Sequence, residues 1–236
     1  MTDDPEEGRP TVAAFDFDGT LTRGGSVFAF LVAVRGLVPV GRAVTRLSPQ
    51  LLRAAVTGGT AADETKERVF ARLLGGLSEV DIDRRAALFA ERHLRRRLRP
   101  EMERRLEWHR SRGHRVVIVS ASPEAYVRTI GELLGADGVL ATRLAVGGGG
   151  LLTGRYEGKN CRGAEKFARL SGWMRAQGLG GGDAQPVLWA YGNGRGDLRL
   201  LNAADHGVNA GRLGRFGRLH RFPSLDDVER RERATR

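Results

Sequence analysis

A short apolar run that ends in two carboxylates constrains this chain more than any other stretch. Residues 12–15 are all apolar, and Asp16, Asp18, Gly19 and Thr20 stand directly after them. Such a run is typical of a strand that is buried on both faces of a parallel sheet. Alternate residues of an extended backbone point to the same side. The two carboxylates are therefore predicted to project together from the carboxyl end of the strand, where open α/β sheets place their ligands.

Two adjacent carboxylates indicate a particular chemistry. They repel each other unless a cation lies between them or one of them holds a proton. Both conditions suit phosphoryl transfer, with one Asp as nucleophile, the other as acid and base, and a metal ion to gather charge. The alternative, a tight turn at Asp18 and Gly19, is disfavoured because the buried strand, both carboxylates, Gly and Thr occur together.

Asp16, Asp18 and Thr20 form the pattern Asp-x-Asp-x-Thr, which resembles motif I of the haloacid dehalogenase superfamily. Phosphatases and phosphomutases of that family carry the second Asp, whereas its dehalogenases and ion-pumping ATPases lack it. The resemblance implies that Asp16 attacks phosphorus and forms an aspartyl-phosphate. It also implies that Asp18 protonates the leaving alcohol and then deprotonates the attacking water. The implied fold class is α/β, with a Rossmann-like parallel sheet as its core.

One further strand end and one helix start provide candidate phosphate ligands. Residues 116–119 are an apolar run that ends at Ser120, beside the predicted start of a helix, where backbone N–H groups favour an anion. Ser120 resembles motif II, although a serine there could equally cap the helix. Lys166 lies in the first turn of a predicted helix over 164–177 and resembles motif III, the alternative being a surface lysine. The resemblance implies a set of phosphate-binding residues: Thr20, Ser120, Ala121 and Lys166.

The last strand end predicts a metal site with one unusual ligand. The strand over 186–191 leads to Asn193 and Asp197, which resemble motif IV, but the family usually has an acidic residue where Asn193 stands. An amide is a neutral ligand, so we expect weaker metal binding. The resemblance implies Mg²⁺ as cofactor, held by Asp16, Asp18 (through its backbone carbonyl), Asn193 and Asp197.

The domain organisation follows from a helical stretch after the first strand. Apolar periodicity predicts helices over 26–35, 63–74 and 79–98, with Gly36 and Pro39 ending the first. In the superfamily an insertion at this point is a cap, and a helical cap is found in the subgroup that includes phosphoserine phosphatases. The predicted organisation is a disordered leader (1–10), a core (11–23 and 100–210), an all-helical cap (24–99) and a basic tail without assigned fold (211–236).

The composition of the chain bears on its expected binding partners and on its expected cellular compartment. The net charge is +11, but lysine occurs only three times and no nucleic-acid module accompanies the arginines, so we expect no nucleic-acid partner. A phosphorylated small molecule is the expected substrate. No apolar run reaches the ~18 residues that span a bilayer, and no secretory signal is visible. A single cysteine, Cys161, fits a reducing cytoplasm, and no His spacing indicates zinc.

The substrate and two other function classes stay open. Phosphoserine phosphatases place an acidic residue nine positions after the nucleophile, where this chain has Gly25, so phosphoserine is expected to be a poor substrate. Four apolar residues at the expected cap entrance favour a larger or partly apolar leaving group, unless they are cap core: Val27, Phe28, Phe30 and Leu31. One alternative is a binding or regulatory protein whose catalysis has decayed at Asn193. The other is a lipid-phosphate phosphatase in peripheral contact with a membrane surface.

Overall fold

The computed structural model describes residues 8–50, 52, 59–179, 185–211 and 219–234. A five-stranded sheet in the order β3-β2-β1-β6-β7 forms its centre, and every pairing in this sheet is parallel. The strands are β1 (Thr11–Phe15), β2 (Arg115–Pro123), β3 (Gly138–Thr142), β6 (Val187–Gly192) and β7 (His206–Asn209). The predicted parallel sheet with an inserted helical cap is confirmed.

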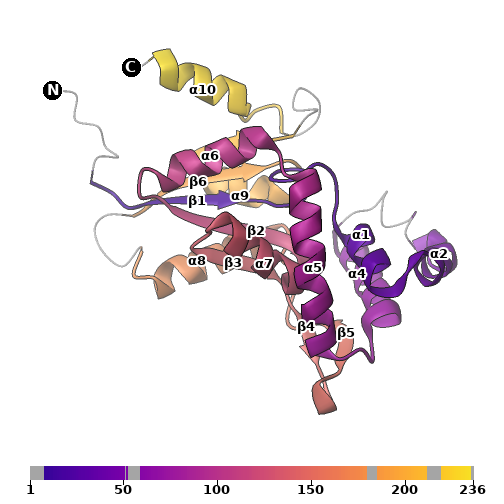
Figure 1. The fold of residues 1–236 in the computed structure, drawn as a ribbon. Helices are drawn as coiled ribbons and strands as arrows, with labels where there is room; N and C mark the ends of the chain where they lie inside the picture. Colours follow the sequence, from indigo (N-terminus) through magenta and orange to yellow (C-terminus); the bar gives the residue numbers. More distant parts are fainter. Residues whose placement is uncertain (1–7, 51, 53–58, 180–184, 212–218, 235–236) are drawn as a thin grey trace.

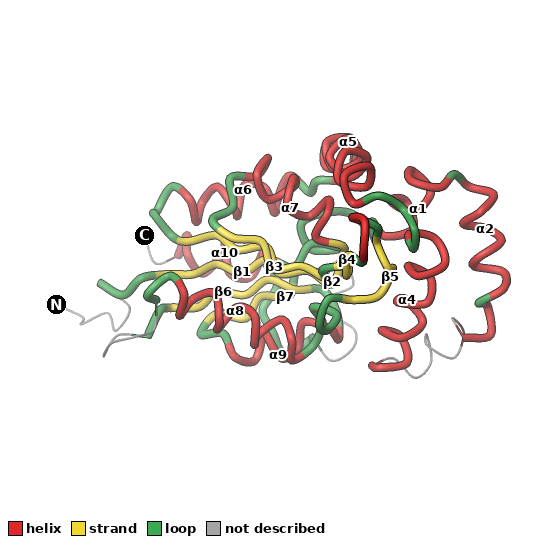
Figure 2. The backbone as a smooth tube through the Cα atoms, turned by 90° about the horizontal axis from the view of Figure 1, so that it is seen from below, coloured by secondary structure: helices red, strands yellow, loops and turns green. Residues whose placement is uncertain are grey.

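Helices cover both faces of the sheet because the side chains of its central strand alternate between two cores. Ala13 and Phe15 of β1 pack with α6 (Pro100–Arg110) and α7 (Glu124–Leu134). Val12 and Ala14 pack on the opposite side, with α8 (Ala164–Ala176) and α9 (Leu198–Ala203). Figure 2 shows the two helix layers on either side of the strands. All four of these β1 side chains are fully buried, as predicted for a strand covered on both faces.

The cap lies beyond the carboxyl end of β1, whose arrow points toward it in Figure 1. It contains α1 (Val27–Arg35), α2 (Leu37–Arg46), α4 (Gly59–Leu74) and α5 (Glu79–Arg97). The sequence prediction missed α2, since Gly36 ends α1 with a φ of 81° and Pro39 suggests a break. Pro39 instead falls in the first turn of α2, where a missing N–H breaks no helical hydrogen bond.

The interior of the cap contradicts the prediction that four apolar residues line the cap entrance. Phe30 is fully buried and Leu31 is 3% exposed, so both belong to the cap core, and Val27 is partly buried against it. Of the four predicted entrance residues only Phe28 is exposed. The apolar character of this stretch therefore reports helix packing rather than the chemistry of the leaving group.

A hairpin from the core joins the cap. The strands β4 (Leu144–Val146) and β5 (Leu152–Tyr156) are antiparallel, with the short 3-10 turn η1 (Gly148–Gly150) between them. Leu152 exchanges backbone hydrogen bonds of 2.8 Å with the turn that follows α4. A Cβ at Gly154 would lie 2.2 Å from the Cα of Ala71, so only glycine permits this approach of strand and helix.

The C-terminal region forms a helix where the sequence analysis assigned no fold. Helix α10 (Leu225–Ala234) contributes Leu225 and Val228 to the core on the α6 side of the sheet, and it lies beyond α6 in Figure 1. Residues 212–218 of the predicted tail and 1–7 of the predicted leader lie outside the described residues. No helix of the described chain is long and apolar enough to cross a membrane.

Candidate active site

The nucleophile candidate lies in the last position that the sheet fixes. The backbone N–H of Asp16 donates to the carbonyl of Tyr191 on β6 (2.9 Å), and the Asp16 side chain is buried. The chain then turns, with Gly19 at a φ of 80°. This turn brings Thr20 back, and its hydroxyl donates to Asp16 Oδ2 at 2.8 Å. The spacing of Asp and Thr in motif I thus produces a direct contact.

Lys166 links the first and last predicted site segments. It lies in the first turn of α8 and is 2% exposed, and its Nζ donates to Asp16 Oδ1 (2.5 Å) and to Asp197 Oδ1 (2.6 Å). A cation at a helix N-terminus opposes the helix dipole, and the two carboxylates compensate for this. They also raise the pKa of Lys166 above its ordinary value, although burial opposes that change. The lysine is therefore charged and close to where a phosphoryl group would meet Asp16.

The pKa of Asp16 rises to about 7, chiefly because of burial and secondarily because of the nearby Asp197 carboxylate. Lys166 and the Thr20 hydroxyl act in the opposite direction. The ionised form of Asp16 therefore depends on cationic partners in a site that excludes water.

Asp18 has a different set of partners. Its Oδ2 accepts a short hydrogen bond from the hydroxyl of Ser122, whereas its Oδ1 is buried and has no partner among the described residues. The Ser122 hydroxyl also approaches that of Ser26 (3.4 Å), which is 2.7 Å from the hydroxyl of Tyr126. One oxygen of this carboxylate is thus fixed by the protein, whereas the other is not.

The predicted phosphate-binding residues of β2 lie at the end of that strand, next to β1. Ser120 is 1% exposed, and its hydroxyl accepts from the N–H of Ser122 (3.1 Å). The Ala121 carbonyl accepts from the Thr142 hydroxyl at 2.8 Å. These contacts fix the backbone at the end of β2, directly before α7, where the N–H groups of a helix start are oriented for an anion.

Asn193 and Asp197 lie at the same edge of the sheet. Asn193 Nδ2 donates to the backbone carbonyl of Asp18 at 3.0 Å. Asp197 Oδ2 accepts from the N–H groups of Asn193 and Gly194, both at 3.0 Å, while its Oδ1 binds Lys166. The four predicted motif segments are therefore joined by direct hydrogen bonds, and Asp197 serves to hold both the lysine and the loop.

The polar groups at this edge of the sheet are of the kind that Mg²⁺ binds, provided that the Asn193 amide rotates. The donor set consists of hard oxygens: the Asp16 carboxylate, the Asp18 carbonyl and the Asn193 amide. Adjacent ligands of octahedral Mg²⁺ lie about 3 Å apart, because each Mg–O distance is about 2.1 Å. The observed separation of 3.0 Å between Asn193 Nδ2 and the Asp18 carbonyl matches this spacing. Turning the amide by half a rotation would present its oxygen in place of its nitrogen.

The cap contributes a lysine that was not predicted as a site residue. Lys66 of α4 donates a short hydrogen bond to the Ala121 carbonyl and lies 3.4 Å from Asn160 Oδ1. Burial lowers the pKa of Lys66 to about 8, against the opposing effect of Asp18 and Asp63. A signal was available, since lysine occurs at only three positions of a chain otherwise rich in arginine.

A buried arginine, also missed, fixes the turn after the nucleophile. The side chain of Arg99 is 8% exposed, and its Nη1 donates to the carbonyls of Gly19 (2.9 Å), Thr20 (3.1 Å) and Ala210 (2.6 Å). Its backbone N–H donates to the carbonyl of Leu21 (2.9 Å). The arginine therefore holds the motif I turn against the segment after β7, at the point where the chain returns from the cap.

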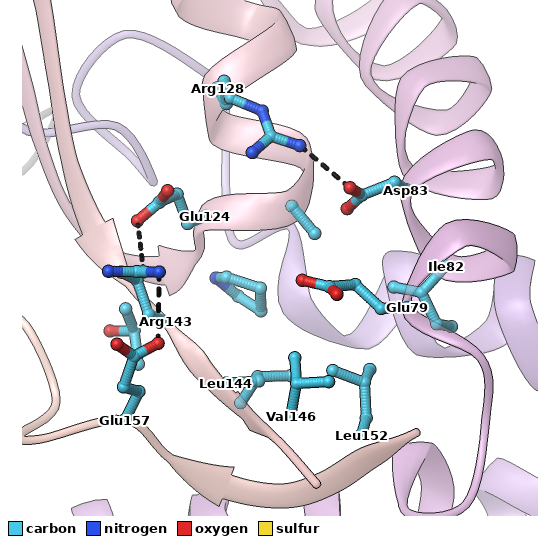
Figure 3. Close-up of a pocket in the computed structure, with 13 residues that line it drawn as sticks. Glu79, Ile82, Asp83, Glu124, Arg128, Arg143, Leu144, Val146, Leu152 and Glu157 are labelled. Carbon is cyan, nitrogen blue, oxygen red and sulfur yellow. Dashed lines mark hydrogen bonds and ion pairs between the residues drawn. The ribbon is translucent and has the colours of Figure 1, made fainter. Parts of the chain in front are cut away.

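A cavity of about 100 Å³ lies at the seam between cap and core, apart from these residues (Figure 3). The start of α5, the start of α7 and the hairpin line it. Arg143 pairs there with Glu124 (3.7 Å) and Glu157 (3.2 Å), and Arg128 of α7 pairs with Asp83 of α5 (3.0 Å). Neither Asp16 nor Lys166 lines this cavity, so it lies where cap and core join and not at the candidate site.

Comparison with known proteins agrees with this geometry. The chain matches the haloacid dehalogenase-like hydrolase family over residues 13–202. It is 35% identical to Protein CicA of Caulobacter vibrioides over 196 residues, which cover 83% of this chain and 84% of that protein. An "Inhibition of morphological differentiation protein" of Streptomyces azureus is 36% identical over 124 residues, 51% of this chain and 43% of that protein.

Solved structures share the fold. A Bordetella pertussis Tohama I protein of unknown function superposes with a TM-score of 0.72 at 21% identity, covering 87% of this chain and 92% of that one. A substrate-bound phosphoserine phosphatase superposes with a TM-score of 0.63 at 20% identity, covering 97% and 99%. With four motif segments joined in one site and a family match over most of its length, this chain belongs to the haloacid dehalogenase-like hydrolase family.

Proposed function

We propose that the protein is a Mg²⁺-dependent phosphomonoester hydrolase that works through an aspartyl-phosphate on Asp16. The observation that carries this proposal is the unequal setting of the two carboxylates. Both oxygens of Asp16 are held, by Lys166 and Thr20, whereas Asp18 has one oxygen fixed by Ser122 and one without a partner among the described residues. An oriented carboxylate suits a nucleophile, and a carboxylate with a free oxygen suits a proton carrier.

In the first step a carboxylate oxygen of Asp16 bonds to phosphorus while the bond from phosphorus to the ester oxygen breaks. The leaving oxygen takes the proton of Asp18. In the second step Asp18, now ionised, accepts a proton from water, and the water oxygen bonds to phosphorus. The acyl-phosphate bond breaks, so that phosphate leaves and Asp16 is restored.

Charge stabilisation comes from groups that are already oriented. Lys166, the hydroxyls of Thr20 and Ser120, and the backbone N–H of Ala121 would surround the transferred phosphoryl oxygens. When bound by the oxygens of Asp16, Asp18 and Asn193, Mg²⁺ would neutralise further charge on the same group. Phosphomonoester hydrolysis without a catalyst is slow enough that enzymes accelerate it up to ~10²¹-fold, which explains so dense an arrangement.

The proposed substrate is a small phosphomonoester other than phosphoserine. Gly25 offers no carboxylate for a substrate ammonium. The buried positions of Phe30 and Leu31 remove the argument for an apolar leaving group. Lys66 adds positive charge from the cap side, which favours an anionic substrate.

Turnover of 4-nitrophenyl phosphate and of a panel of phosphorylated metabolites, with Mg²⁺ or with chelator, tests the proposal. We expect Mg²⁺-dependent phosphate release that Asp16→Asn lowers by about 10⁴-fold, and phosphoserine among the slower compounds. Asp226→Asn, an exposed position on α10, serves as the matched control and should keep full activity. A folded Asp16→Asn protein with more than a hundredth of the activity would contradict the proposal. Binding of phosphomonoesters without any turnover would instead favour a binding or regulatory protein.

A further inference from the structure

The part of the cap that precedes α4 carries positive charge only. Between Asp18 and Asp63 the chain contains five arginines and no acidic residue. Helices α1 and α2 lie in this stretch, and α2 lies at the end of the cap far from the sheet (Figures 1 and 2). The surface that these two helices form therefore attracts anions.

Arginines from three cap helices line one hollow on this surface, which we call the arginine hollow. Its volume is about 440 Å³, and α1, α2 and α4 supply its lining: Arg35, Pro39, Arg42, Arg46, Arg72 and Leu73. The four arginines are exposed, and none of them belongs to an ion pair with a described residue. Arg35 is oriented by a hydrogen bond of 2.6 Å from its Nε to the carbonyl of Leu73. Four cations without a carboxylate between them repel one another, and an anion from outside the protein would relieve that repulsion.

Apolar side chains are exposed on the same helix faces as these arginines. On α2, Val38, Arg42 and Arg46 follow one another at intervals of four residues and therefore lie along one face. Val38 is 62% exposed. On α1, Phe28 is 54% exposed and lies two helical turns before Arg35, on the same face. Exposed apolar residues beside arginines without acidic partners are the combination that suits an anionic membrane surface.

A bilayer that contains anionic phospholipid satisfies both features at once. Headgroup phosphates would pair with the guanidinium groups, which bind phosphate through two hydrogen bonds. Val38 and its exposed neighbour Leu37 would enter the boundary between headgroups and acyl chains. A second copy of the chain is a poorer partner, because a two-fold contact would place the four arginines against the same four. Single-stranded nucleic acid is also a poorer partner, because it stacks on aromatic rings and the apolar residues exposed on α2 are aliphatic.

We propose that the end of the cap formed by α1, α2 and α4 docks on an anionic membrane surface, with headgroup phosphates in the arginine hollow. The proposal concerns where the protein works, and it does not depend on the phosphatase function. None of the candidate active-site residues lines the hollow. Membrane binding can therefore be measured apart from catalysis.

Co-sedimentation with vesicles tests the proposal. Vesicles of phosphatidylcholine alone are compared with vesicles of equal parts phosphatidylcholine and phosphatidylserine. We expect the native protein to bind the anionic vesicles only, and high salt to release it. The double variant Arg42→Gln, Arg46→Gln should lower the partition coefficient about 25-fold, since each basic residue near such a surface contributes about fivefold. Val38→Ser should lower it several-fold and leave the salt dependence unchanged, because it removes apolar area and no charge.

The matched control is Arg95→Gln, Arg96→Gln, which removes the same charge from exposed positions of α5 outside the hollow. Its partition coefficient should stay within about twofold of the native value. An equal loss in both double variants would reduce the effect to net charge and overturn the proposal. Equal binding to the two kinds of vesicle, or binding to neither, would overturn it as well. Binding of tripolyphosphate without binding of anionic vesicles would assign the hollow to a soluble polyanion and contradict docking on a membrane.

Discussion

At the scale of single residues, the proposed reaction depends on which side-chain oxygen atoms already accept hydrogen bonds from the protein and which do not. Lys166 is shared by Asp16 and Asp197, so that one ammonium holds carboxylates from two separate strand ends. The second carboxylate oxygen of Asp197 accepts hydrogen bonds from backbone N–H groups. Asn193 can take two roles in this arrangement, because its amide donates to the Asp18 carbonyl through Nδ2 and, after rotation, would present Oδ1 to a cation bound by that carbonyl.

Replacement of Asn193 by Asp should strengthen metal binding and weaken the metal-free protein. The carboxylate adds a charge–charge attraction to Mg²⁺, so the half-saturating concentration should fall about ten- to a hundred-fold, each factor of ten being about 1.4 kcal/mol. Without metal, the carboxylate cannot donate to the Asp18 carbonyl, and the free energy of unfolding should fall by about 1–3 kcal/mol. Activity and urea unfolding, each titrated with Mg²⁺, measure the two effects. Identical Mg²⁺ curves would remove Asn193 from the proposed metal site.

Lys66 should give the activity an alkaline limb. With a pKa of about 8, its ammonium is present below that pH and is lost above it, so kcat/KM for a phosphate dianion should decline as pH rises from 7 to 9. Lys66→Arg should move the decline upward, because arginine stays charged. Lys66→Met should lower kcat/KM at pH 7 and flatten the limb.

Lys159→Met is the matched control for this pH profile, since Lys159 is exposed. Its profile should coincide with that of the native protein. An alkaline limb that survives Lys66→Met would assign the titration to another group.

At the scale of elements, helix α10 is tied to the core by one buried ion pair. Arg105 of α6, whose side chain is 1% exposed, donates to both carboxylate oxygens of Glu232 at 2.9 and 2.8 Å. The Arg105 Nε donates to the hydroxyl of Tyr191 at 2.6 Å, and its guanidinium stacks on Trp108 at 3.9 Å from the ring centroid. The C-terminal helix thus completes the environment of a charge that would otherwise be buried alone.

Glu232→Gln should therefore lower the free energy of unfolding by about 2–3 kcal/mol, somewhat less than a fully buried pair because Glu232 is 27% exposed. Arg230→Gln breaks an ion pair of the same helix whose partners are 69% and 44% exposed, and it should cost less than about 1 kcal/mol. Urea denaturation of both variants measures the difference. Equal stabilities would mean that the Arg105–Glu232 pair does not hold α10 in place.

At the scale of the whole molecule, the features that depend on short stretches of sequence were predictable. The apolar run before Asp16 and the alternation of strands with helices predict the parallel sheet, and the resemblance to the family's motifs implies that Asp16, Thr20 and Lys166 share one site. Contacts between cap and core were not predictable in the same way. Lys66 lies on a helix whose pattern shows only that one face is buried, not what that face meets. Helix α10 was missed because its strongly charged sequence hides the two apolar residues that dock it.

The central claim is tested most directly by isolating the phosphoenzyme. Asp18→Asn cannot activate water, but 4-nitrophenyl phosphate has a leaving group that departs without a proton donor. Incubation with Mg²⁺ and this substrate should therefore add one phosphoryl group to the variant, seen by intact mass and mapped to the peptide that contains Asp16. Hydroxylamine should remove it, as expected of an acyl phosphate. The double variant Asp16→Asn, Asp18→Asn should stay unmodified, and a phosphoryl group on any residue other than Asp16 would contradict the account.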